Sequence, residues 1–397
     1  MKFIDWILVA LDRNSNGECN AVLATLLDWQ KAFPRIDHKI GINSFIKNGV
    51  RPALIPILIS FCQNRRMVLK WHGKMSSEKK LPASAPQGST IGILLYLSAS
   101  NDNCDKVPVD DRFKFVDDAS IIEVISLLNV GLASHNSKIH VSSQIPENGQ
   151  FIPSEHLKTQ KYVEDINNGT EENKMILNPK KTKNIIFNFS NNNQFTTNIK
   201  LKGENLEIVE EAKLLGTIIT SDLKWKRNTE EIVKDANKRM RILHAAAKFT
   251  SKISDLKTIY YMFIRSKLEH SSVVWSSAIT QEEKDDLERI QKAAVKVITG
   301  NKYEDYEEAL KWLNMTTLDQ RRQDFSLKFA KSCLKNDKVK HFFPLNIMNE
   351  KNTRNHEKYK VNFAHRKRYK NSTIPNMQRL LNKDEILKKK ILRRFGL

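Results

Sequence analysis

The stretch Phe113-Lys114-Phe115-Val116-Asp117-Asp118-Ala119-Ser120-Ile121-Ile122 places two adjacent aspartates inside a half-apolar run. Adjacent carboxylates repel each other, and each is costly to keep charged near apolar surface. A divalent cation would relieve both costs. Apolar residues alternate around the pair over 111–124, which predicts two short strands with the acids at or beside the turn between them.

A third acid stands far upstream, at the end of another apolar run. Residues 21–29 read Ala-Val-Leu-Ala-Thr-Leu-Leu-Asp-Trp, which predicts a buried strand that delivers Asp28 at its end. Magnesium prefers carboxylate ligands and takes few of them from the protein. Asp28, Asp117 and Asp118 together are therefore a candidate magnesium cluster.

The composition favours an anionic partner. The chain has 397 residues, 40% hydrophobic and 28% charged, and a formal net charge of +21. This length predicts two or three domains with buried cores. The charge favours nucleic acid as the partner, with an acidic membrane surface or a merely soluble basic protein as the alternatives.

The four cysteines are scattered, without zinc or disulfide spacing, and no apolar run approaches the length of a membrane span. We therefore expect an intracellular protein, nuclear or cytoplasmic, with no membrane partner, and the sequence points to no protein partner.

The pattern of apolar and polar residues changes along the chain. Helices are expected over 37–62 (in two pieces), 91–97 and 156–175, a hairpin around His72-Gly73-Lys74, and strands over 185–187 and 196–225. Residues 131–155 are polar and predict a loop or insertion. From 228 to 336 helical spacing dominates. Residues 351–397 carry 15 Lys/Arg against three acids, which indicates either a localisation or phosphate-binding patch or a solvated flexible tail.

Five segments occur in the order of the reverse transcriptase motifs A to E. They are Leu27-Asp28-Trp29-Gln30-Lys31-Ala32-Phe33, Ala85-Pro86-Gln87-Gly88-Ser89, Phe115-Val116-Asp117-Asp118, Leu177-Asn178-Pro179-Lys180-Lys181-Thr182-Lys183 and Lys213-Leu214-Leu215-Gly216-Thr217-Ile218-Ile219. Each segment alone is a weak signal, but the ordered set, over roughly residues 15–335, resembles the reverse transcriptases of non-LTR retrotransposons.

The resemblance implies an α+β fold, a right-hand polymerase palm with an antiparallel sheet and packed helices, followed by an all-α thumb and C-terminal extension. The expected domains are a residual fingers segment (1–20), the palm (21–225, with the insertion 131–155), the helical thumb and extension (226–345) and a basic tail (346–397). The endonuclease and most of the fingers would be missing, so we expect a 5′-truncated element or an open-reading-frame fragment.

The resemblance also implies roles for single residues. Asp28, Asp117 and Asp118 would be catalytic and would hold two Mg²⁺ ions, with Mn²⁺ as the alternative. Lys181 would protonate or screen pyrophosphate, with Lys180 and Lys183 as rivals and a solvated basic turn as the plain alternative.

Phe33 would be the steric gate that selects dNTPs, and its plain alternative is an ordinary core phenylalanine. Gln87 and Gly88 would line the nucleotide, unless they only form a turn into a helix. Leu215 and Gly216 would belong to the primer grip. Pro34 follows Phe33 directly and biases it away from helical geometry.

The implied function is RNA-directed DNA polymerisation, which adds dNTPs to a DNA primer on an RNA template. The first alternative is a catalytically inactive remnant that only binds nucleic acid. A second alternative, from another class, is a basic helical scaffold protein with an accidental aspartate pair.

Overall fold

The computed structural model describes residues 1–12, 20–86, 88–126, 149–190, 194–250, 252–346 and 357–394. Its contacts divide the chain into two compact units. We call Glu18–Ala212 the sheet unit, and Met1–Gly17 together with Lys213–Leu397 the helical unit. Helices and strands are both present, as expected, and the predicted domain boundaries stay predictions.

The sheet unit is built on a five-stranded sheet in the order β13-β9-β1-β7-β6. Its strands are β1 (Asn20–Leu27), β6 (Arg112–Phe115), β7 (Asp118–Ser126), β9 (Lys183–Phe187) and β13 (Glu207–Ile208). The central strand β1 pairs antiparallel with both β7 and β9. Residues 21–25 of β1 are fully buried, which agrees with their near-continuous apolar sequence.

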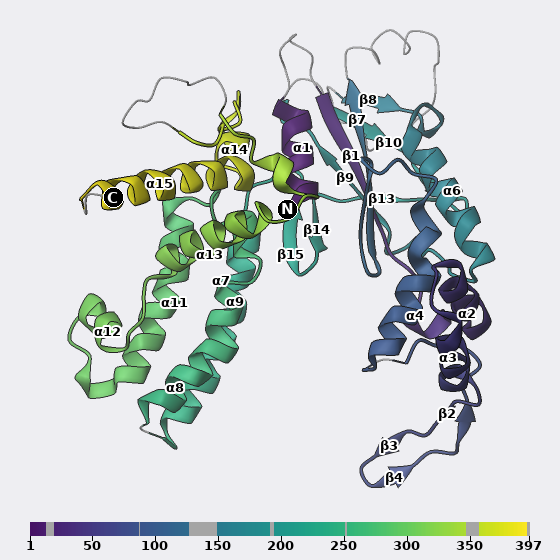
Figure 1. The fold of residues 1–397 in the computed structure, drawn as a ribbon, viewed down its shortest axis with the longest axis horizontal. Coiled ribbons are helices and arrows are strands. Elements are labelled where there is room, and N and C mark those ends of the chain that lie inside the picture. Colours follow the sequence, from purple (N-terminus) through teal and green to yellow (C-terminus); the bar gives the residue numbers. More distant parts are fainter. Residues whose placement is uncertain are drawn as a thin grey trace. The chain divides into compact units, whose positions relative to one another are not determined.

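Helices and small strand pairs complete the sheet unit (Figure 1). The helices are α2 (His38–Lys47), α3 (Ile55–Cys62), α4 (Thr90–Ser100) and α6 (Lys158–Glu172), with short 3₁₀ turns at Phe33–Arg35, Pro52–Leu54, Asn101–Cys104 and Ser154–His156. The small pairs are β2 (Arg66–Met67) with β5 (Lys79–Lys80), β3 (Lys70–Trp71) with β4 (Lys74–Met75), β8 (Gly149–Ile152) with β10 (Gln194–Thr197), and β11 (Lys200–Leu201) with β12 (Glu204–Asn205). The predicted insertion lies mostly outside the described residues.

The helical unit confirms the predicted change of pattern after residue 226. Its longer helices are α1 (Lys2–Asp12), α7 (Lys226–Ala247), α8 (Ile253–Ile259), α11 (Gln281–Thr299), α12 (Tyr306–Trp312), α13 (Leu318–Cys333) and α15 (Thr373–Arg394). Shorter turns lie at Tyr260–Arg265 (η6, a π-helix), Ser266–Leu268 (α9), Ser272–Trp275 (α10), Gly300–Lys302, Lys340–Phe342 and Lys367–Lys370 (α14). The strands β14 (Glu211–Leu214) and β15 (Thr217–Thr220) form a separate hairpin.

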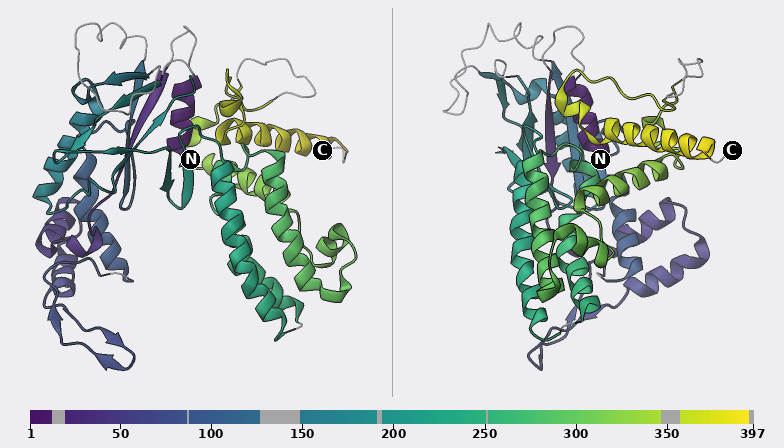
Figure 2. Two further views of the ribbon diagram at one scale, coloured as in Figure 1. Left: turned by 180° about the vertical axis from the view of Figure 1, so that it is seen from behind. Right: turned by 90° about the vertical axis from the view of Figure 1, so that its left-hand side faces the viewer.

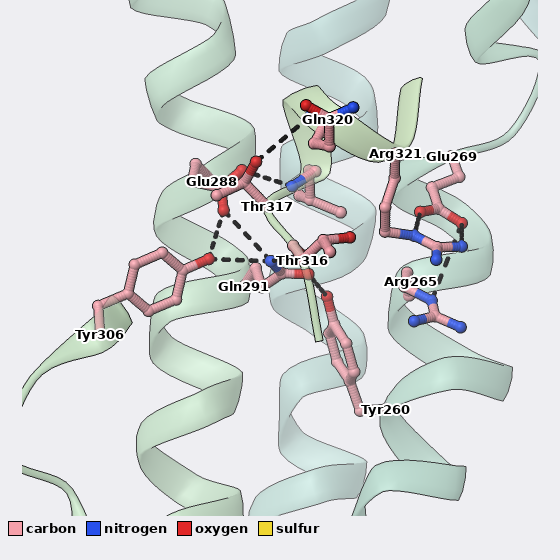
Figure 3. A network of polar contacts seen from close by, with 11 residues as sticks. Tyr260, Arg265, Glu269, Glu288, Gln291, Tyr306, Thr316, Thr317, Gln320 and Arg321 are labelled. Carbon is pink, nitrogen blue, oxygen red and sulfur yellow. Dashed lines mark hydrogen bonds and ion pairs between the residues drawn. The ribbon is translucent and has the colours of Figure 1, made fainter. Parts of the chain in front are cut away.

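A buried network of hydrogen bonds links several helices of the helical unit (Figure 3). Gln291 of α11 is fully buried. Its Nε2 donates to the carbonyl oxygen of Thr316 at 3.0 Å and to the Tyr306 hydroxyl at 2.9 Å, while its Oε1 accepts from the Tyr260 hydroxyl at 2.6 Å. Satisfied buried networks of this kind fix how elements pack.

The basic C-terminal region is folded over the residues described. In α15, Ile374, Met377 and Leu381 are buried, and this helix packs against α13. The Asp12 carboxylate of α1 accepts from the backbone N–H groups of His365 and Arg366, at 3.0 and 2.7 Å. The alternative of a fully solvated flexible tail is therefore wrong for residues 357–388, because side chains and backbone there are held by the unit's core.

Candidate active site

The aspartate pair lies at the turn between β6 and β7, as the sequence predicts. Phe115 pairs with Asp118, so Val116 and Asp117 form a two-residue turn. Val116 has a φ of 57°, which is unusual for a β-branched residue and costs of order 1–3 kcal/mol. Asp117 and Asp118 are both exposed. The turn thus presents two carboxylates to solvent from a strained backbone.

Asp28 joins this pair through the register of β1. Leu27 pairs with Ala119, so the next residue, Asp28, falls opposite Asp118. Although Asp118 is exposed, its partial burial raises the pKa of its carboxyl, and the charges of Asp117 and Asp28 raise that pKa further. Oδ2 of Asp28 is buried and has no hydrogen-bond partner among the described residues. Asp28 and Asp117 therefore both lie near enough to Asp118 for their charges to oppose its ionisation.

Asp28 is held from its other side by the predicted motif D turn. Its backbone N–H donates to Oγ1 of Thr182 at 3.2 Å, and its carbonyl oxygen accepts from the N–H of Asn178 at 2.9 Å. Thr182 is fully buried. Sequence reasoning missed the role of Thr182, although it lies within the motif D segment.

Lys181 lies on this turn and is exposed. Its rival Lys183 forms an ion pair with Glu207, so it is engaged elsewhere. Lys180 is exposed like Lys181. The choice of Lys181 over Lys180 and Lys183 as the motif D lysine stays a prediction.

Phe33 contacts a residue that sequence reasoning did not assign to the site. Its ring stacks on that of Tyr96 in α4, with ring centroids 4.4 Å apart and an interplanar angle of 19°. The pKa of Tyr96 is raised, first by burial and then by the charge of Asp117. Tyr96 thus contacts the predicted gate and is near enough to Asp117 for that charge to act on its hydroxyl. Its signal was present in the sequence, because Tyr96 follows the motif B segment by seven residues.

Backbone hydrogen bonds join the motif A and motif B segments. The N–H of Ala85 donates to the carbonyl oxygen of Phe33, and that of Ser84 to Ile36, both at 2.9 Å. Phe33 begins a 3₁₀ helix that includes Pro34, so the expected bias of Phe33 away from helical geometry is not observed. These hydrogen bonds hold the motif A and motif B segments side by side.

The turn into α4 depends on glycine at two positions. Gly88 has a φ of 82°, a conformation that favours glycine. A Cβ added to Gly92 would lie 2.0 Å from the carbonyl oxygen of Pro86. Ser89 caps α4 by accepting from the N–H of Gly92 at 3.1 Å. Gln87, predicted to line the nucleotide, lies outside the described residues.

Leu215 and Gly216 form the tight turn between β14 and β15, in the helical unit. Their φ values are 48° and 79°, and two-residue hairpins favour positive φ at both turn positions. The His270 ring lies against this turn, with Nε2 3.2 Å from the carbonyl oxygen of Leu215. His270 leaves no room for a side chain at Gly216. The predicted primer grip is therefore a rigid hairpin.

Over the described part of the chain, no group of three or more His, Cys, Asp or Glu side chains stands ready to hold a metal ion. No helix within those residues is long and apolar enough to cross a bilayer. The chemistry of the acids still suits a divalent cation, because the Oδ2 atom of Asp28 lacks a partner and Asp118 feels two neighbouring charges.

Two solved structures resemble the chain only distantly. Telomerase from Candida tropicalis is 14% identical, with a TM-score of 0.37, over 81% of this chain and 50% of that one. Telomerase from Candida albicans, in complex with a fragment of telomeric RNA, is 12% identical, with a TM-score of 0.37, over 80% and 54%. Such scores are too low to support a statement about this chain.

Sequence relatives are more informative, although no family model matches. The chain is 35% identical over 101 residues to a probable RNA-directed DNA polymerase from transposon X-element of Drosophila melanogaster, which is 25% of this chain and 10% of that protein. It is 22% identical over 287 residues to a probable RNA-directed DNA polymerase from transposon BS of the same species, which is 72% of this chain and 29% of that protein. It is 23% identical over 223 residues to the RNA-directed DNA polymerase from mobile element jockey, also of that species, which is 56% of this chain and 22% of that protein. The chain thus spans less than a third of each relative. The motif-based resemblance is confirmed: over these stretches the chain is similar to the RNA-directed DNA polymerases of mobile elements.

Proposed function

We propose that the sheet unit carries the catalytic centre of an RNA-directed DNA polymerase. It would add dNTPs to the 3′-hydroxyl of a DNA primer on an RNA template. The observation that supports this most is the pairing of β1, β7 and β6, which sets Asp28 opposite Asp118 at the turn that carries Asp117. On this proposal the sheet unit is a polymerase palm, and the helices that follow are the thumb and extension.

Asp28, Asp117 and Asp118 would hold two Mg²⁺ ions, with Mn²⁺ as the alternative. Their repulsion and the unpartnered Oδ2 of Asp28 both fit this role. When bound, the ions would activate the primer hydroxyl and stabilise charge on the leaving pyrophosphate. The protein's own contribution is to preorganise the three carboxylates, Asp28 through Thr182 and the pair through the strained turn.

Phe33 would exclude a ribose 2′-hydroxyl and so select dNTPs. The stack on Tyr96 supports this, because a ring held on one face keeps a fixed wall toward the substrate. Gly88, at the turn before α4, would lie along the nucleotide, and we propose the same role for Gln87.

Lys181 would donate a proton to pyrophosphate or screen its charge. The hydrogen bonds that tie its turn to Asp28 support a place near the reacting groups. Leu215 and Gly216 would hold the primer end, on the rigid hairpin backed by His270. A nuclear or cytoplasmic location follows from these proposed substrates.

Primer extension tests the proposal. The full chain is given an RNA template, a labelled DNA primer, dNTPs and Mg²⁺. We expect a double variant, Asp117→Asn with Asp118→Asn, to lose roughly 100-fold or more in rate, since it removes charge where the transition state needs it. The variant should melt no lower than wild type, because neutralising these acids removes repulsion.

The matched control is Asp110→Asn, an exposed acid that lies just before β6 in sequence, and it should leave extension unchanged. Equal extension by wild type and the double variant would refute the polymerase proposal.

A second candidate is nucleic-acid binding without turnover. The net charge of +21 favours it. It predicts that the wild-type chain retains RNA in filter binding but extends no primer, and that binding weakens as salt rises.

A further inference from the structure

A basic hairpin projects from the sheet unit between the motif A and motif B segments. It comprises β2 to β5, residues 65–80. Arg66 pairs with Lys80 and Met67 with Lys79 near its base, and Lys70 pairs with Met75 and Trp71 with Lys74 near its tip. Figures 1 and 2 show β3 and β4 at the far end of this unit, beyond α3.

The hairpin exposes large apolar side chains. Trp71 is 71% exposed, Met75 69% and Leu69 64%. The ring of His72 lies edge-on to that of Trp71, with centroids 4.9 Å apart, and this contact restrains the indole. Contiguous exposed apolar side chains of this size are a feature of interaction surfaces.

The same hairpin carries excess positive charge. Residues 65–80 include six Lys or Arg and one acid, Glu78. Arg66 and Lys80 stand directly opposite each other, which destabilises a strand pair. Glu78 offsets this by an ion pair with Arg66 at 3.0 Å. Four lysines of the hairpin form no ion pair within the described residues: Lys70, Lys74, Lys79 and Lys80.

One class of ligand would satisfy both features. A single-stranded polynucleotide offers phosphates for lysines and flat bases for an aromatic ring. Trp71 and Lys74 face each other across β3 and β4, so their side chains leave the same face of the hairpin. A base stacked on the indole would place its phosphate within reach of that ammonium group.

A pocket of about 640 Å³ lies next to the start of the hairpin, beside α2 and α3. Arg65, Arg66 and Lys80 line it together with apolar side chains such as Ile42 and Ile59. A strand bound along the hairpin would thus meet further cationic surface as it approaches the helices.

Chain continuity favours nucleic acid over an anionic membrane as the occupant. Four residues after β5, Ser84 and Ala85 bond to the Phe33 segment. A strand held on the hairpin would therefore be tethered to the element that the proposed function assigns to the nucleotide. We propose that this hairpin binds single-stranded RNA through stacking on Trp71 and phosphate contacts from its lysines. The choice of RNA rests on the proposed function.

The test is fluorescence anisotropy of a labelled 20-nucleotide oligouridylate with the full chain, in EDTA and without dNTPs, across a salt series. Catalysis cannot contribute under these conditions. We expect Trp71→Ala to weaken binding about tenfold at fixed salt. Unchanged affinity would overturn the proposal, whereas a chain that binds through Trp71 but extends no primer would refute only the polymerase.

A charge variant and its control separate local contacts from overall charge. The hairpin variant replaces three exposed lysines by glutamine: Lys70, Lys74 and Lys79. The control replaces three exposed lysines of the helical unit by glutamine: Lys335, Lys338 and Lys340. The plot of log affinity against log salt has a negative slope, and the hairpin variant should reduce the magnitude of that slope by about 2. The control variant should reduce it by clearly less.

Equal losses in the two variants would overturn the proposal. So would hairpin variants that bind RNA normally but lose binding to phosphatidylserine vesicles. The substituted side chains of the hairpin are exposed and do not pack in the core, so we expect all variants to melt at the wild-type temperature. An unchanged melting temperature would show that a loss of binding is local.

Discussion

Replacing Thr182 by valine should loosen the backbone at Asp28. Valine keeps the shape of threonine but removes Oγ1, which accepts from the Asp28 N–H at 3.2 Å. An amide left without its partner costs about 1–3 kcal/mol when buried. Because this bond is long and only partly buried, we expect about 1.5 kcal/mol. A local loss of that size raises the exchange rate of the Asp28 amide proton roughly tenfold.

The assay is amide hydrogen exchange, resolved at Asp28. Thr182→Ser keeps the hydroxyl and should keep the protection of that amide, although it loses a buried methyl group. Thr170→Val is the matched control, because Thr170 is also fully buried but donates within its own helix, to the carbonyl oxygen of Asn167 at 2.9 Å. It should leave Asp28 unchanged.

Unchanged protection of the Asp28 amide in Thr182→Val would refute the reasoning. Equal loss in the valine and serine variants would also refute it, since the hydroxyl would then not be the cause.

Two further predictions concern the same unit. Gly92→Ala should destabilise the chain by more than about 1 kcal/mol in a denaturant titration, because the new Cβ would clash with the carbonyl oxygen of Pro86. Gly169→Ala, in open space on α6, should instead stabilise the chain by about 0.5–1 kcal/mol. A change of the same sign in both variants would contradict this prediction. Asp117→Asn should lower the pKa of Asp118, since a neighbouring negative charge that opposes its ionisation is removed; carboxyl NMR titration measures the shift, and an unmoved midpoint would disprove the coupling.

The local elements were predictable from the sequence because their patterns are strong. The apolar run that ends at Asp28 predicts β1, and the alternation around the aspartate pair predicts β6 and β7 with the acids at the turn. The helical spacing after residue 226 predicts α7, α11 and α13 closely. In each case the hydrophobic period alone decides the element.

Contacts between distant segments were not predictable in the same way. The bond from Asp28 to Thr182 joins residues 154 positions apart, and nothing in either local sequence encodes it. The stack of Phe33 on Tyr96 and the packing of the basic C-terminal residues against α13 are similar cases. Such contacts depend on topology, which periodicity does not specify.

The pairing of β1 has a consequence for synthesis of the chain. β1 is made early, but its partners in the sheet are β7, which ends at Ser126, and β9, which ends at Phe187. At about 5–20 residues per second, this apolar strand waits roughly 10–30 seconds before its second edge can be covered. Until β7 is made both edges of β1 can pair with other chains, and until β9 is made one edge still can. The nascent chain is therefore most prone to aggregate before residue 187 emerges, and dependence on chaperones should be greatest for chains stalled short of that point.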